Sequence, residues 1–324
     1  GGPFYYIERG MGSKWKWLAK IFAFFGIFVG LFGIGTFSQV NGISSAVNSF
    51  FDPDMQWTIN IPGIGTYSWT VVIASLILSV CVALVLIGGL KRIASVSQII
   101  VPFMAVIYIV ICVMLLICNI TKIPEAVVII VKSAFKPSAV AGGIAGSFIV
   151  AMQKGVARGI FSNEAGLGSS VMINANSSAD QHHTQGMWAM LSVFIDTIII
   201  CTMTALCILS SGADQKSSVG FDMALIAFQD GLGDFAGAFL SIATFIFAIT
   251  TVTGWWIYGR SCFVYLFTKK WIGVYLAIFI VTAFVGAVIQ ATVVWDVSDL
   301  FNGLMAIPNL LAIILLRKEV KADI

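Results

Sequence analysis

The sequence predicts an all-α polytopic membrane protein with about eight transmembrane spans. Of the 324 residues, 59% are hydrophobic and 10% are charged, and the mean hydropathy is +0.99. A soluble globular chain carries about 25% charged residues, so water is not the main solvent of this chain. Apolar runs of about 20 residues, the length that crosses a ~30 Å hydrocarbon core, recur along the whole sequence. The net charge of +3 is small and scattered, and it predicts no nucleic-acid partner.

Length and helix breakers define the spans, because helices that are apolar all round carry no informative period. The eight predicted spans are Trp15–Ser38, Ser68–Gly89, Ser97–Asn119, Val140–Asn174, Gly186–Ser210, Ala236–Tyr258, Trp271–Val293 and Val297–Leu316. Pro124–Phe135 and Phe221–Leu232 are amphipathic enough to form helices along the membrane surface, and Asn41–Tyr67 is expected to be a long connection. With the first span running outward, twelve Lys and Arg residues lie on the cytoplasmic side and four on the outer side, as the positive-inside rule requires.

The spans follow one another without a soluble domain, so residues 1–324 are predicted to form a single transmembrane domain. The six cysteines show no CxxC pair or metal-ligand spacing, and most are expected to pack as small hydrophobic side chains within the spans. The opening GGPFYYIERGMG is neither a signal peptide nor a helix start, which predicts a cytoplasmic loop. Because the first residue is Gly1, we expect the chain to begin inside a longer protein.

The fourth span has an unusual composition. Lys154, Arg158 and Glu164 lie in its middle, among glycines and the polar pair Ser162 and Asn163. A charged side chain at mid-membrane costs about 2.5–3.5 kcal/mol on insertion scales. Glycines and polar residues together predict a helix broken near Ile160–Gly166, whose free backbone groups would line a cavity and bind a zwitterion or an ion. The alternative is an ordinary loop between two re-entrant segments, with Arg158 and Glu164 paired.

The sixth span contains neighbouring hydroxyl groups in FAITTVTGWWIYG. Thr250 and Thr251 could coordinate Na⁺, a hard ion that prefers oxygen ligands. Alternatively, each threonine hydroxyl bonds back to a carbonyl one turn earlier in the helix. The residue patterns alone favour this second interpretation.

Two further polar positions are candidates for a site. Asp196 lies in the fifth span, where an acidic side chain is a functional hypothesis by default; it could instead be a structural partner for Thr197 or Thr202. Gln39 follows the first span, whose glycines predict a smooth face for close helix approach. Gln39 either is an ordinary polar residue at a helix end or reaches a central site.

Two patterns typical of enzymes are incomplete in this sequence. His182 and His183 are adjacent and lack H-E-x-x-H spacing. Ser162, His182 and Asp196 supply the residue types of a catalytic triad, but their spacing does not bring them together, and the serine has no G-x-S-x-G elbow. The sequence therefore predicts that the protein is not an enzyme.

Six motifs resemble, in the same order, those of the sodium:alanine symporter family, whose members import alanine or glycine with a cation. They are GGPFYYIERG, FGIGTFSQVN, KGVARGIFSNEAGLGS, FIDTIIICTMTA, FAITTVTGWWIYG and NGLMAIPNLL. The resemblance covers essentially the whole chain, and RGIFSNEAGLGS is its most specific part. It implies a partial LeuT-type inverted-repeat fold that lacks the N-terminal helices, with core helices 3 to 10 of ten present.

The resemblance also implies roles for individual residues. Phe161, Ser162 and Asn163 would line the substrate pocket, and Trp255 would form its wall, with Gln39 nearby. Thr250 and Thr251 would help to hold Na⁺, and Thr251 would also face the substrate. The chain departs from the family pattern at SVMINANSS and at Arg260, where an acid is usual; both departures concern the cytoplasmic side more than the substrate class.

The function implied is sodium-coupled symport of a small neutral amino acid into the cell by alternating access, in a cell membrane of bacterial type. Na⁺ is the coupling ion, and neither another metal nor a cofactor nor a protein partner is expected. Alanine and glycine are both possible substrates. The alternatives are proton coupling through Asp196 or Glu164, or a non-transporting membrane receptor or enzyme.

Overall fold

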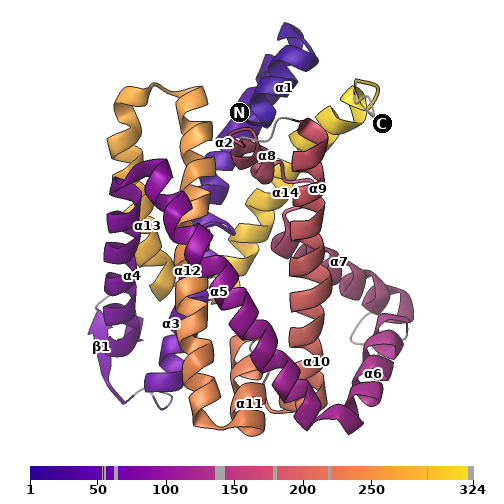
Figure 1. Cartoon of the computed structure of the whole chain (residues 1–324). Coiled ribbons are helices and arrows are strands. Elements are labelled where there is room, and N and C mark those ends of the chain that lie inside the picture. Colours follow the sequence, from indigo (N-terminus) through magenta and orange to yellow (C-terminus); the bar gives the residue numbers. More distant parts are fainter. Residues whose placement is uncertain are drawn as a thin grey trace. The chain divides into compact units, whose positions relative to one another are not determined.

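The computed structural model describes residues 1–52, 54, 56–61, 65–135, 143–177, 181–217, 220–289 and 291–319 (Figure 1). It is almost entirely helical. Seven helical segments within the described residues are long and apolar enough to cross a membrane: Ser13–Phe51, Trp69–Ile87, Lys91–Cys118, His183–Ser211, Asp234–Leu266, Lys269–Val288 and Val293–Leu316. The predicted all-α polytopic membrane fold is confirmed.

The predicted spans correspond to α4 (Trp69–Ile87), α5 (Gly89–Cys118), α12 (Asp234–Leu266), α13 (Ile272–Val288) and α14 (Ala291–Leu316). Helices α5 and α12 are longer than predicted, because helical hydrogen bonding continues past the apolar stretch that marks the span. The two amphipathic segments are helices, α6 (Ile123–Phe135) and α11 (Gly220–Leu232), and their place along the membrane surface stays a prediction.

The fourth predicted span, Val140–Asn174, is not among the seven membrane-crossing helices. Its first residues, 140–142, lie outside the described part of the chain. The rest forms α7 (Gly143–Asn163) and the short α8 (Ser169–Asn174). The cations and polar residues that made this segment unusual also lower its hydropathy.

The first predicted span lies within the candidate span Ser13–Phe51, but its helix is interrupted. Helix α2 (Lys16–Phe32) ends at a break of four residues, Gly33–Thr36, and α3 (Phe37–Phe51) follows. The expected connection Asn41–Tyr67 was wrong, since α3 continues to Phe51. Beyond it, β1 (Thr58–Ile61) and β2 (Gly65–Ser68) pair as an antiparallel hairpin; residues 62–64 between them lie outside the described part.

The N-terminal segment is a helix, not the expected loop. Helix α1 (Pro3–Gly10) has proline at its first position, where the missing N–H costs nothing. Its apolar face buries Phe4 and Ile7, and the Phe4 ring stacks on Tyr265 with centroids 4.5 Å apart. Eight residues were too few to show an amphipathic period in the sequence.

The fifth predicted span is helical throughout but not uniform. It comprises α9 (His182–Val193), the π-helical segment η3 (Phe194–Cys201) and α10 (Thr202–Ser211). Asp196 lies in the π-helical part, whose wider turns are rare and frequently occur at functional sites.

The helices form two compact units. Unit 1 comprises Gly1–Val101, Glu164–Trp188 and Thr244–Ile324, and unit 2 comprises Pro102–Asn163 and Ala189–Ala243. Two of the boundaries fall at Pro102, a proline inside α5, and at the end of α7. The single domain expected for residues 1–324 stays a prediction.

Unit 1 is built on close helix approach. Helix α2 packs against α14, and α13 packs against α3 and α4. A Cβ added at Gly26 would lie 2.5 Å from the Cys262 sulfur, and one at Gly259 would lie 2.0 Å from the Tyr275 hydroxyl. Small residues at helix interfaces are the usual means of packing helices in lipid.

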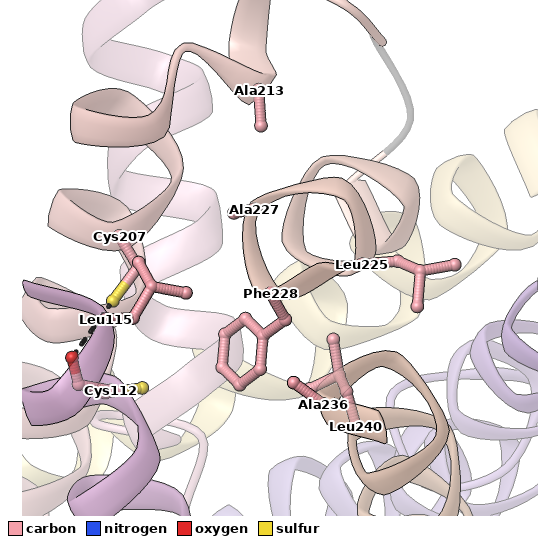
Figure 2. Packing of buried hydrophobic residues seen from close by; sticks show 9 residues of the cluster. All are labelled: Cys112, Leu115, Cys207, Ala213, Leu225, Ala227, Phe228, Ala236 and Leu240. Atoms are coloured by element: carbon pink, nitrogen blue, oxygen red, sulfur yellow. Dashed lines mark hydrogen bonds between the residues drawn. The ribbon is translucent and has the colours of Figure 1, made fainter. Parts of the chain in front are cut away.

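Unit 2 has a separate apolar cluster, shown in Figure 2. Its residues come from α5, α10, α11 and α12 and from the turn after α10: Cys112, Leu115, Cys207, Ala213, Leu225, Ala227, Phe228, Ala236 and Leu240. Near this cluster, a hydrogen bond of 2.7 Å joins the hydroxyls of Tyr108 and Thr204. The buried thiols of Cys112 and Cys207 pack as small apolar groups, as the sequence predicts.

Candidate functional site

The helix break that follows α7 is the first part of the candidate site. Helix α7 ends at Asn163, and Glu164 has a positive φ of 54°. Gly166 and Gly168 both have φ of 81°, a conformation that glycine adopts without steric cost. The predicted break is confirmed, and it begins after Asn163, so that Ile160–Asn163 still belong to the helix. Glu164 is the only described non-glycine residue with positive φ, which marks a strained position.

The last turn of α7 carries the unit 2 candidates. The Arg158 guanidinium lies over the Phe161 ring, 5.2 Å from its centroid. Ser162 donates a hydrogen bond to the Asp196 carboxylate on η3, and the Thr197 hydroxyl donates to the same oxygen at 3.2 Å. The sequence spacing had not indicated that Ser162 and Asp196 would meet. Asp196 thus has hydroxyl partners in Ser162 and Thr197, and a functional role for this carboxylate stays a prediction.

In unit 1, Glu164 is linked to Trp255. The indole Nε1 of Trp255 on α12 donates to Glu164 Oε1 at 3.0 Å, and the hydroxyl of Ser169 donates to Glu164 Oε2. Trp255 is 1% exposed, so it does not face lipid. Its ring meets Tyr258 edge to face, with centroids 5.0 Å apart.

The hydroxyls of Thr250 and Thr251 both donate to the Phe247 carbonyl oxygen, at 2.7 and 3.1 Å. This is the back-bonding that the sequence offered as an alternative to sodium coordination. The two interpretations are compatible, because a hydroxyl has one donor and two acceptor lone pairs. Back-bonding uses the donor and fixes the oxygen, which keeps acceptor capacity for a cation.

The break between α2 and α3 is held by polar groups of its own segment. The Thr36 hydroxyl donates to the Gly30 carbonyl at 2.5 Å, and the Gln39 amide donates to the Ile34 carbonyl at 3.2 Å. Gln39 therefore points back toward the break. At Gly35, an added Cβ would lie 2.6 Å from both Cβ and Cγ of Trp255, so the break lies directly against the candidate substrate wall.

Asn309 is a site residue that the sequence analysis missed. Its side-chain amide on α14 donates to the Gly166 carbonyl at 2.8 Å, and its carbonyl oxygen accepts a hydrogen bond from the Tyr6 hydroxyl on α1. Asn309 is 1% exposed. An amide after a proline in an apolar span was the available signal, since an intramembrane polar group requires a partner.

Known proteins of one family match this chain along its length. The family model described as the sodium:alanine symporter family matches residues 1–324. This chain belongs to the sodium:alanine symporter family. Relatives include an uncharacterized transporter of Haemophilus influenzae, 43% identical over 99% of this chain and 67% of the relative, and the sodium/alanine symporter AgcS of Methanococcus maripaludis, 38% identical over 100% and 68%. The amino-acid carrier protein AlsT of Bacillus subtilis is 37% identical over 98% of this chain and 63% of its own length.

Membership of this family establishes that the protein is a transporter. Members of the sodium:alanine symporter family are transporters and not enzymes, and together with the seven apolar helices this makes the chain a multi-pass plasma-membrane protein. The chain spans about two thirds of the length of these relatives.

The predicted site residues of this symporter chain fall into two groups. Unit 1 holds Gln39, Glu164, Thr250, Thr251 and Trp255, and unit 2 holds Arg158, Phe161, Ser162, Asn163 and Asp196. Within each group the structure joins pairs: Glu164 with Trp255, and Ser162 with Asp196. Across the described ranges, no three His, Cys, Asp or Glu side chains gather as metal ligands.

Proposed function

We propose that the full-length protein imports a small neutral amino acid, alanine or glycine, together with Na⁺ by alternating access. Membership of the sodium:alanine symporter family supports sodium-coupled amino-acid transport, and one relative is named a sodium/alanine symporter. The structural observation that carries the proposal is the interruption between α7 and α8. Unwound backbone in a membrane protein offers N–H and C=O groups to the carboxylate and ammonium of an amino acid.

In this proposal the last turn of α7 binds the substrate. Phe161, Ser162 and Asn163 end the helix immediately before the break. Asp196 orients the Ser162 hydroxyl by accepting its hydrogen bond, which leaves the lone pairs of the serine oxygen facing away from that bond. In this proposal Asp196 acts on the substrate only through Ser162, and it does not carry a proton.

The proposed sodium ligands are the Thr250 and Thr251 oxygens on α12. Their shared bond to the Phe247 carbonyl fixes both hydroxyls on one turn. Moving one elementary charge across 100 mV supplies about 2.3 kcal/mol. A single Na⁺ can therefore drive roughly forty- to fiftyfold accumulation before any concentration gradient is added.

The test is uptake of labelled alanine by the full-length protein in proteoliposomes, with Na⁺ or K⁺ outside. We expect uptake only with Na⁺, and Thr251→Ala should raise the half-activating sodium concentration roughly tenfold, as for the loss of one polar contact of about 1–1.5 kcal/mol. Thr253→Ala is the matched control, since Thr253 back-bonds in the same way to the Ile249 and Thr250 carbonyls. Sodium-independent uptake, or an equal effect of both substitutions, would contradict the sodium assignment.

Trp255 is the proposed wall that limits substrate size. A substrate with one methyl group offers little apolar area, at ~0.8 kcal/mol per buried carbon, so selectivity depends on excluding larger side chains. Trp255→Ala should admit valine and leucine as competitors and weaken alanine uptake. An unchanged competitor ranking would remove Trp255 from the site.

A further inference from the structure

The Trp255 indole is held between two unwound segments of unit 1. On one side is Gly35, in the break between α2 and α3, where an added Cβ would lie 2.6 Å from Trp255 Cβ and Cγ and 2.8 Å from Cδ2. Distances under 3.0 Å do not occur between real Cβ atoms and their neighbours. Glycine is therefore required at position 35 for the indole to occupy its place.

On the other side is Glu164, in the break between α7 and α8. Glu164 Oε1 accepts the indole N–H at 3.0 Å, and Oε2 accepts the hydroxyl of Ser169. Ser169 is fully buried at the start of α8. The carboxylate therefore connects the indole to the first turn of α8, and its backbone, at φ 54°, is held in a conformation unusual for glutamate.

We propose that Glu164 and Gly35 are positioning residues that set the substrate-size limit through Trp255. This inference depends on the proposed function, in which Trp255 is the substrate wall. A pocket distinguishes substrates that differ by one methylene only about 10- to 200-fold. A tryptophan that could turn to another rotamer would give way to the larger side chain, and that discrimination would be lost. The hydrogen bond at the indole edge and the glycine contact near its Cβ together prevent this turn.

Two possible roles of Glu164, as a proton carrier or as a positioning residue, make different predictions for its substitutions. A proton carrier needs a carboxyl group that gains and loses a proton, whereas a positioning residue needs only acceptor oxygens in the right place. Glutamine keeps an acceptor for the indole N–H and can donate to the Ser169 hydroxyl. Leucine has a similar size and neither group. Glu164→Gln should therefore preserve the wall, and Glu164→Leu should release it.

The experiment measures alanine uptake by the full-length protein in proteoliposomes, with glycine, serine, valine and leucine as competitors. Glu164→Leu should lower the preference for alanine over leucine about tenfold with little change in sodium activation, and Glu164→Gln should retain the preference. Gly35→Ala should lower alanine affinity about tenfold, because the wall is displaced. Gly42→Ala, on α3 where an added Cβ meets nothing within 4 Å, should leave uptake unchanged.

Coupling through Trp255 is tested with Trp255→Phe, which keeps the ring but lacks the N–H donor. Adding Glu164→Leu to Trp255→Phe should change the competitor ranking no further. Independent effects of the two substitutions would overturn the proposal. Loss of uptake in Glu164→Gln equal to that in Glu164→Leu would also overturn it, because the charge of the carboxylate would then be what matters.

A second measurement does not depend on transport. In protein labelled with 5-fluorotryptophan, the ¹⁹F resonance of Trp255 can be assigned by its absence in Trp255→Phe. It should stay sharp and near the wild-type shift in Glu164→Gln, and move or broaden in Glu164→Leu and Gly35→Ala. An unchanged resonance in these two variants overturns the positioning role. If the wild-type protein takes up no small amino acid, the proposed function fails even where this resonance responds as expected.

Discussion

The two helix breaks of unit 1 satisfy their backbone groups in different ways. Between α2 and α3, most polar partners come from the same short segment, as when Thr36 bonds to Gly30 and Gln39 to Ile34, and Ser298 on α14 adds a bond of 3.4 Å to the Phe32 carbonyl. Between α7 and α8, they come from distant helices, since Asn309 on α14 bonds to Gly166 and Trp255 on α12 bonds to Glu164. The side-chain hydrogen bonds of the first break are therefore mainly local. The second break depends on α12 and α14 in addition to the local bond from Ser169 to Glu164.

Asn309→Leu is expected to have the largest effect on the second break. It removes the donor to the Gly166 carbonyl and the acceptor for Tyr6, and each buried polar group left without a partner costs about 1–3 kcal/mol. Alanine uptake by the full-length protein should fall by at least tenfold, and the apparent melting temperature should drop.

Asn302→Leu is the matched control on the same helix. Asn302 is also buried, but its side-chain oxygen has no hydrogen-bond partner among the described residues. This substitution removes an unsatisfied group, so the melting temperature should be unchanged or higher. If Asn309→Leu were no worse than Asn302→Leu, α14 would not support the break.

Thr36→Val should affect the first break through stability alone. The buried Gly30 carbonyl loses a hydroxyl donor, at a cost of about 1 kcal/mol, while Thr36→Ser keeps the donor. We expect a melting temperature lower by a few degrees in the valine variant, with the competitor ranking unchanged. A changed ranking would show that this break also responds to the substrate.

The smallest expected effect concerns Asp52, another locally satisfied group just after α3. Its carboxylate accepts from the backbone N–H of Gln56 at 2.8 Å and from the Ser68 hydroxyl at 2.6 Å. These bonds hold the pKa of Asp52 below its usual value, with the Ser68 hydroxyl as the largest cause. Because the pKa of Asp52 is lower in the folded state, its carboxylate stabilises the fold fully above the unfolded pKa of about 3.9. This stabilisation is lost as the pH falls through the pKa of the folded state.

Hydrogen exchange at the hairpin can detect this loss of stabilisation by the Asp52 carboxylate. Protection of the Gln56 amide, relative to α4, should decline at pH values below about 4, and Asp52→Asn should remove that pH dependence. Asp54→Asn, at an exposed carboxylate that accepts a hydrogen bond of 3.5 Å from the Gln56 side chain, should leave the dependence in place. A hairpin equally protected at all pH values would exclude Asp52 as its support.

The two breaks also differ in how far the sequence predicts them. The break after α7 was predictable because charges and glycines occur together at mid-membrane, where an intact helix would be costly. The break at Gly33–Thr36 contains no charge, and its glycines resemble Gly26 and Gly30, which do serve helix packing. Spacing cannot separate these two uses of glycine, and it is the interruption between α2 and α3 that places Gly35 in a break.

Side-chain partners from distant helices were the least predictable part of the site. The types of Ser162, Asp196, Glu164 and Trp255 indicated chemistry, but which of them meet depends on helix rotation within each unit. Helix α1 was missed for a related reason: its eight residues are stabilised by the Phe4 stack on Tyr265 and by the Glu8 carboxylate, which accepts from Tyr265 and pairs with Lys16. The two contacts with Tyr265 join residues more than 250 positions apart.

The π-helical segment η3 constrains the number of residues in the helix that contains it. It separates Asp196, which bonds to Ser162 on α7, from Thr204, which bonds to Tyr108 on α5. A π-helical turn holds an additional residue compared with an α-helical turn, so it changes the angular phase between these two side chains. Deleting one residue between them would rotate one by about 100° relative to the other, and both bonds could not then form together. Insertions and deletions in this helix are therefore constrained as strictly as substitutions at the two contact positions.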